Sequence, residues 1–306
     1  MQRSERQDGA ISFALRAMLL AALAVPLPAI VHAQNTVAPR APATGPGAVP
    51  APAAPNGMTG QTVLLQYRIE VAGAYGLRVD VVLRHEANRY AIDTRVRKEG
   101  ILATLTSRYR AENSATGRLA NGAVLPIAGT GRIEVPDDLR SYRFDYKPDG
   151  SYALVDQPPH TPKAGREVSE AQRRGSFDPL TAVAVALLGR ADPCTGPISI
   201  FDTRKRFDLV PRGSVEQALP RQEGPKPIGA ALRCDIGMKR IAGYRGDEKD
   251  GPTDKPSRLW LAKFDDSGRF YPARLEVDTG FGQLVVWLEN VTSRPQTPED
   301  KAALTR

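Results

Sequence analysis

Apolar and polar side chains alternate along most of this chain from residue 61 onward. The alternation is clearest where Val63, Leu65, Tyr67, Ile69 and Val71 take every second position. It recurs over residues 77–83, 90–97, 105–111, 141–146, 152–156, 198–201, 206–210, 230–238, 259–264, 273–277 and 284–290, with a turn expected at residues 117–122. A period of two indicates half-buried β-strands, and short connections favour antiparallel neighbours. The sequence therefore predicts a single, mainly antiparallel all-β domain over residues 61–291.

One segment, residues 179–188, has the pattern of a helix instead. Asp178 stands at the N-cap position, Pro179 at the first helical position and Gly189 just past the end. The helical stripe consists of Leu180, Val183, Ala184, Leu187 and Leu188, and Thr181 is the only polar side chain on the other side. A helix that is apolar all round must be buried. We therefore expect an open β-barrel or β-spiral that buries this short helix in its concave face.

The first 60 residues have the composition of a leader and a linker. Three arginines precede an apolar run of about 14 residues, and the compact residues Val31 and Ala33 occupy the two specificity positions of a cleavage site. This is typical of a signal peptide, so we expect residues 1–33 to be removed near Ala33 and the protein to reach the periplasm. The run is shorter than the roughly 20 residues that span a bilayer, which argues against an integral membrane protein. Residues 34–60, rich in Ala and Pro, are predicted to be a disordered linker, and residues 292–306 a polar tail.

The chain is basic. It has 42 Lys and Arg against 34 Asp and Glu, a net charge of +8, and loss of three basic and two acidic residues with the leader would leave +7. This charge favours anionic neighbours such as phosphorylated lipid or glycan, although codon bias alone also explains it. Six arginines on the polar side of neighbouring strands form either a cationic face or an ordinary solvated one: Arg78, Arg84, Arg95, Arg97, Arg108 and Arg110.

Cys194 and Cys234 are the two cysteines of the chain. In an exported protein such a pair is expected to form a disulfide. Closing a loop of about 40 residues stabilises the fold by about 4 kcal/mol on the chain-entropy model. Two free thiols, or one thiol paired with a partner protein, are the alternatives.

The remaining residues offer little for catalysis. After the leader, His85 and His160 are the only histidines, and we interpret both as surface residues. The sequence contains no His and Cys cluster for a metal, no Cys-x-x-Cys motif, no phosphate-binding glycine loop and no nucleophile elbow. The acidic pairs at residues 137–138 and 265–266 fit turns. We therefore expect a non-enzymatic protein without catalytic residues, metal or cofactor.

A charged turn is predicted within residues 201–207. Asp202 is a typical turn residue, and Arg204, Lys205 and Arg206 follow it. Two interpretations remain open: a solvated turn, or a recognition tip that contacts phosphate or carboxylate groups.

Several blocks together resemble the DUF3108 family of exported bacterial proteins. They are the Asp-Pro-Leu block at 178–180, the Phe-Asp-Thr-Arg block at 201–204, the two cysteines, and residues 67–73, 94–102 and 239–244. The resemblance extends over residues 64–291, with Thr203 where the family usually has glycine. It implies a curved β-shell similar to the β-spiral of EipB-type envelope proteins, and more distantly to LolA-like lipoprotein carriers. It implies no established activity and no catalytic residues.

These features predict a non-enzymatic periplasmic protein that supports the cell envelope as a binding or scaffold module. Its partner would be an envelope component, namely a protein, a lipid or an anionic glycan, and not a nucleic acid. Two alternatives are a carrier that shields a lipid or acyl chain inside the shell, and an enzyme of unrecognised type. The position of the helix discriminates between the scaffold and the carrier. If the helix fills the lumen permanently, the protein is a scaffold; if the helix can leave, the lumen becomes a hydrophobic binding site.

Overall fold

The structure is a computed structural model that describes residues 60–100, 103, 109–135, 138–189, 192–220, 224–244, 256–279 and 282–305. The expected signal peptide and, apart from Gly60, the expected linker lie outside these residues.

Within these ranges thirteen strands form a single antiparallel sheet. They are β1 (Gln61–Val71), β2 (Ala74–His85), β3 (Arg89–Lys98), β4 (Arg110–Ala120), β5 (Ala123–Val135), β6 (Asp138–Tyr146), β7 (Tyr152–Gln157), β8 (Ile198–Phe201), β9 (Arg206–Gln217), β10 (Ala231–Ala242), β11 (Ser257–Ala262), β12 (Tyr271–Thr279) and β13 (Gly282–Pro295). The order across the sheet is β7-β6-β5-β4-β3-β2-β1-β13-β12-β11-β10-β9-β8. The edge strands β7 and β8 do not pair, so the sheet stays open. The prediction of an open, mainly antiparallel β-fold is confirmed.

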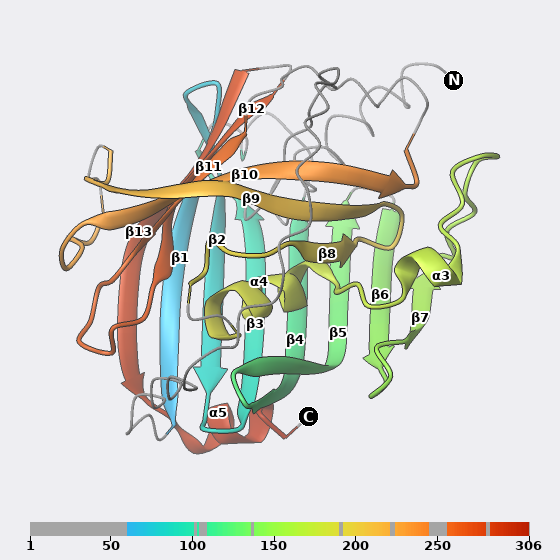
Figure 1. Ribbon diagram of the computed structural model, residues 1–306, viewed down its shortest axis with the longest axis horizontal. Coiled ribbons are helices and arrows are strands. Elements are labelled where there is room, and N and C mark those ends of the chain that lie inside the picture. The colour runs from blue at the N-terminus through green and yellow to red at the C-terminus, as the bar shows by residue number, and fades with distance from the viewer. Residues whose placement is uncertain are drawn as a thin grey trace, which may run out of the picture.

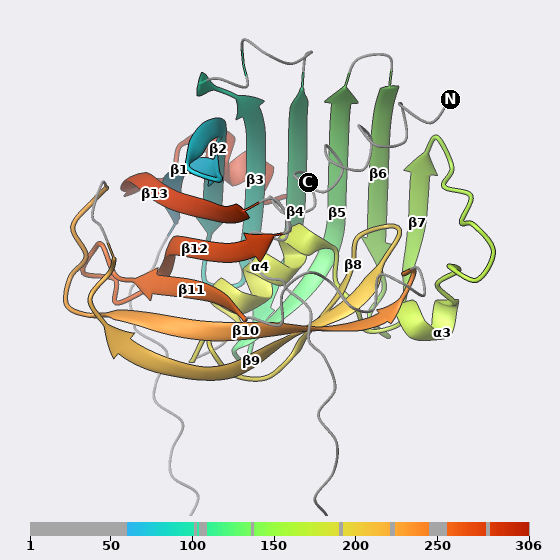
Figure 2. The same cartoon turned by 90° about the horizontal axis from the view of Figure 1, so that it is seen from above.

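The sheet curves into two walls. In Figure 1, β1–β7 lie roughly vertical in the view, while β8, β9 and β10 run across in front of them. Seen from above, helix α4 (Pro179–Leu188) lies between the two walls (Figure 2). The helix therefore occupies the concave face, as the sequence predicted. Two shorter helices lie at the periphery, α3 (Glu170–Arg173) beside β7 and α5 (Pro298–Ala303) at the lower end of the first wall in Figure 1.

The core follows the predicted alternation. On β1 the side chains of Val63, Leu65, Tyr67 and Ile69 are buried and point to the inside of the curve. They belong to two apolar clusters, one that includes Leu180 and Ala184 of α4 and another that includes the two cysteines. The clusters combine residues of both walls, so the curvature of the sheet creates the core.

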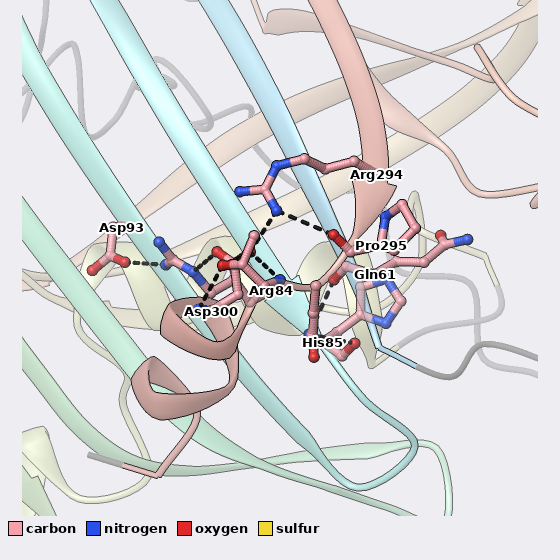
Figure 3. Close-up of polar contacts among 9 residues, drawn as sticks. Gln61, Arg84, His85, Asp93, Arg294, Pro295 and Asp300 are labelled. Carbon is pink, nitrogen blue, oxygen red and sulfur yellow. Dashed lines mark hydrogen bonds and ion pairs between the residues drawn. The ribbon is translucent and has the colours of Figure 1, made fainter.

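The C-terminal segment is more ordered than expected. We expected a polar tail over residues 292–306, but β13 pairs with β1 as far as Pro295 and is followed by α5. Asp300 is buried and binds Arg84 Nε at 2.8 Å and Arg294 Nη1 at 2.6 Å (Figure 3). Asp300 of this segment thus pairs with Arg84 of β2, 216 residues away in the sequence, a relationship that no local pattern reveals.

The region around residues 117–122 also differs from expectation. Strand β4 continues through Gly117, the turn is confined to Asn121 and Gly122, and the next strand, β5, was not predicted. Its inner face carries Gly129 and Gly131, where an added Cβ would overlap the Asp178 carboxylate and the Tyr142 ring. Neighbouring side chains fill these positions, so the strand lacks the apolar alternation that identifies others.

Candidate functional site

The N-terminus of α4 is anchored deep in the shell. Asp178 caps the helix as predicted, since its Oδ1 accepts hydrogen bonds from the backbone N–H groups of Leu180 at 3.0 Å and Thr181 at 3.1 Å. Its Oδ2 accepts hydrogen bonds from the hydroxyls of Thr181 and of Tyr146 on β6. Burial raises the pKa of the Asp178 carboxyl, and these hydrogen bonds partly offset that effect. The anchor fixes one end of the helix to the first wall.

The rest of α4 is less completely buried than the sequence predicted for a helix with apolar side chains on all sides. Leu180 and Ala184 are buried, whereas Val183, Leu187 and Leu188 are only half-buried. The reason is position: the helix packs against β4, β5 and β8. The part of the lumen beside β1, β2 and β3 is not filled by it.

An apolar cavity lies in this unfilled part of the lumen. Its volume is about 120 Å³, and Leu180, Val183 and Leu187 form its helical side. The facing wall is mainly aliphatic and includes Ile69, Val81 and Ile92. Cavities on the order of 150 Å³ with such linings bind benzene or xenon. The lumen therefore has room for a small apolar group without any movement of α4.

A second, smaller cavity of about 30 Å³ lies beside the same helix. It is lined by Cys194, Cys234, Ile198 and Leu261, and again by Val183 and Leu187. Together with Leu259 and Pro272, these two helical residues line both cavities.

The predicted disulfide is confirmed. Cys194 and Cys234 are bonded, with a Cα–Cα distance of 5.5 Å and a sequence separation of 40 residues. The bond links the segment that follows α4 to β10, and both cysteines are buried. The disulfide thus restrains the chain near the C-terminal end of the helix and forms part of the smaller cavity wall.

Polar groups meet the larger cavity at β3 and β4. Asn113 Nδ2 donates to Thr94 Oγ1 at 3.1 Å, and the Tyr142 hydroxyl donates to Asn113 Oδ1 at 3.0 Å. Thr94 and Asn113 both line the cavity. This pair was not predicted from the sequence, although one signal was present: Asn113 stands between Ala111 and Ala115 in the buried register of its strand.

Residues 201–207 form a tight turn, and a recognition role for its basic residues stays a prediction. Asp202 Oδ1 accepts hydrogen bonds from the N–H groups of Arg204 at 3.0 Å and Lys205 at 2.6 Å. Thr203 has a φ of 75°, in the left-handed region where the resembled family has glycine. Lys205 Nζ lies 4.6 Å from the centre of the Tyr244 ring.

Arg206 does not belong to this tip. Its side chain is buried and pairs with Asp208 at 2.6 Å. Its Nε donates to the carbonyl of Gln172, 34 residues away in α3. Arg206 therefore links β9 to α3. It was assigned to the turn only because it is adjacent to the turn in the sequence.

The surface interpretation is wrong for His85. This residue is only 2% exposed, and burial, reinforced by the charge of Arg269, lowers its pKa to about 4. It lies at the end of β2, where Gln296 Nε2 donates to its carbonyl (Figure 3). His160 is exposed, as expected. Asp265 is a turn residue and accepts from Ser267 N–H at 3.1 Å, whereas Asp137 lies outside the described residues.

The arginines of the strands form ion pairs. Arg78 binds Glu289 at 2.7 Å, Arg95 binds Glu112 at 3.1 Å and Arg97 binds Glu99 at 3.1 Å. Arg84 binds Asp300 and Arg110 binds Glu112, while Arg108 lies outside the described residues. This arrangement favours a charge-balanced, solvated face over a cationic one.

No family model matches this chain, and no curated protein matches it. In the described ranges, no helix is long and apolar enough to cross a membrane. The same residues include no group of three or more His, Cys, Asp or Glu placed to hold a metal ion.

Proposed function

We propose that this protein is a non-enzymatic binding protein of the bacterial cell envelope that shields an apolar chain in its lumen. The observation that carries this proposal is the cavity of about 120 Å³ between α4 and the first wall. A scaffold whose helix filled the lumen would leave no such space. The cavity therefore favours the carrier alternative over the scaffold, and it does so without requiring α4 to leave.

The lining favours lipid over the other envelope partners. Aliphatic side chains surround most of the cavity, and its polar contacts include Thr94 and Asn113 on neighbouring strands. Burying a methylene group there would contribute about 0.8 kcal/mol, whereas a glycan would lose hydrogen bonds to water. A carbon chain would occupy the apolar part, and a polar head would find hydrogen-bonding groups at the β3–β4 end.

The disulfide supports export. Structural disulfides persist in oxidising compartments such as the periplasm. Together with the N-terminal composition, Cys194–Cys234 supports cleavage near Ala33 and a periplasmic location. N-terminal sequencing of periplasmic protein should find a start near Gln34, and an intact Met1 would contradict this. Membership of the DUF3108 family is likewise a proposal, supported by the curved shell with its internal helix.

Native mass spectrometry of protein purified from the periplasm tests the proposed binding directly. We expect a population whose added mass corresponds to a lipid or fatty acid and is lost on extraction with organic solvent. Extracted protein should then bind a fluorescent apolar probe such as 1-N-phenylnaphthylamine, and decanoate should displace the probe.

A cavity-filling variant provides the control. Val81→Phe fills the cavity and should abolish probe binding, whereas Val82→Phe, at the next position of β2 and absent from the cavity lining, should retain it. Circular dichroism checks that both variants fold. Absence of an adduct and of probe binding in the wild type would overturn the proposed function.

A further inference from the structure

The two apolar cavities of the lumen share four lining residues: Val183 and Leu187 of α4, Leu259 of β11 and Pro272 of β12. Val183 and Leu187 lie four residues apart, on one face of α4. The larger cavity extends from them toward β1–β4 and the smaller toward the disulfide and β8–β11. We infer that Val183 and Leu187 form a partition that sets the length of a single, unbranched acyl chain bound in the lumen. This inference rests on the proposed function and specifies its ligand.

The dimensions favour a linear chain over a ring system. The two spaces measure about 120 Å³ and 30 Å³, and they adjoin along Val183, Leu187, Leu259 and Pro272, which line both. The smaller space is lined by aliphatic side chains, prolines and the disulfide. A saturated chain is narrow enough to continue from one space into the other once the partition is shortened, whereas a fused ring is not.

The surroundings of the partition hold its backbone in place. The N-terminal end of α4 is fixed by Asp178, and the chain beyond its C-terminal end is restrained at Cys194. Truncated core side chains leave residual cavities because the surrounding structure relaxes only partly. Leu187→Ala should therefore join the two cavities into one longer space.

A series of saturated fatty acids with an even number of carbons from 6 to 16 tests the inference by displacement of the fluorescent probe. In the wild type, affinity should rise about fourfold with each buried methylene and level off when the larger cavity is full. In Leu187→Ala the rise should continue for about three more methylenes, the equivalent of the carbon atoms removed. We call the chain length at which affinity stops rising the levelling point. Val183→Ala should move the levelling point to longer chains by a smaller amount than Leu187→Ala, and Leu187→Phe should move it to shorter chains.

Leu188→Ala is the matched control. Leu188 is the next residue of α4 and is similarly half-buried, but it packs in the cluster around Val63 and borders neither cavity. This variant loses the same number of carbon atoms, and its levelling point should equal that of the wild type.

The outcomes separate the two proposals. Fatty acid binding with the same levelling point in wild type, Leu187→Ala and Leu187→Phe would overturn the partition and leave the proposed function standing. Failure of every fatty acid to displace the probe from the wild type would count against the proposed function itself. Should Leu187→Ala fold poorly, Leu187→Phe alone decides, because an unchanged levelling point in that variant also contradicts the inference.

Discussion

The hydroxyl of Tyr146 on β6 and the backbone and carboxylate of Asp178 are joined by two hydrogen bonds. The hydroxyl donates to Asp178 Oδ2 at 2.9 Å and accepts from the Asp178 N–H at 2.6 Å. The preceding residue, Phe177, pairs through its backbone with β8, at the other free edge of the sheet. Near this junction the rings of Phe144 and Phe201 lie 6.3 Å apart. Side chains and one short segment therefore link the two ends of a sheet whose edge strands do not pair.

Replacing Tyr146 by Phe should weaken this link. The buried Asp178 carboxylate would lose a donor, and hydrogen bonds to charged groups contribute about 1.5–3 kcal/mol. We expect the free energy of unfolding in urea to fall by that amount. Tyr152→Phe is the control, because the Tyr152 hydroxyl contacts the neutral Ser176 Oγ at 3.2 Å and should contribute about 1 kcal/mol. An equal decrease in the free energy of unfolding of the two variants would show that the hydrogen bond to Asp178 contributes no more than the hydrogen bond to Ser176.

Removing the disulfide should destabilise the domain without unfolding it. Loss of a native disulfide typically costs about 2–5 kcal/mol. Cys194→Ser, Cys234→Ser and the double variant should lose similar stability, because either single change already breaks the bond. Denaturant titrations measure the loss. Alkylation of unfolded, non-reduced protein should label neither cysteine, and free labelling of both in periplasmic material would contradict the pairing.

His85 should make stability depend on pH. Its pKa is lowered to about 4 in the folded protein, whereas an unfolded histidine has a pKa of about 6.5. Between these values the unfolded state binds more protons, so the free energy of unfolding falls as pH decreases from about 6.5 to 4, by on the order of 3 kcal/mol. Urea titrations of wild type and His85→Gln across this window should differ in slope, with a flatter profile in the variant.

The exposed His160 supplies the control for that experiment. His160→Gln should keep the pH profile of the wild type. A His85→Gln profile that also parallels the wild type would show that His85 is not responsible for the loss at low pH.

Asp300→Asn should release α5 from the sheet. Burial would raise the pKa of Asp300, but hydrogen bonds from Arg294, Thr297 and Arg84 outweigh it and hold the pKa well below its usual range. The contribution of Asp300 is therefore present above about pH 4 and is lost as pH falls toward its folded pKa. Removing one partner of such a pair costs about 3 kcal/mol. Hydrogen exchange at neutral pH should speed up over residues 298–304.

Asp138→Asn, at a more exposed pair with Arg140, should cost less than about 1 kcal/mol and leave exchange in α5 unchanged. Unaltered protection of α5 in Asp300→Asn would mean that packing alone, including the buried Leu304, holds the helix.

The sequence by itself determined the elements whose signals are local. Alternation identified β1, β2 and β3 because each side chain in a strand faces one of only two environments. The helix at 179–188 was recognisable because Asp178, Pro179 and Gly189 act on the backbone next to them. The disulfide was predictable because the chain offers a single intramolecular pair.

Tertiary structure alone decided the features that depend on the curvature of the sheet. It placed α4 against β4, β5 and β8 and left an apolar cavity beside it, which the composition of the helix could not reveal. It buried His85 and Arg206 and joined Arg84 to Asp300 across 216 residues. A polar residue looks the same in sequence whether its partner is solvent or a distant side chain, so its burial becomes visible only once the two walls have come together.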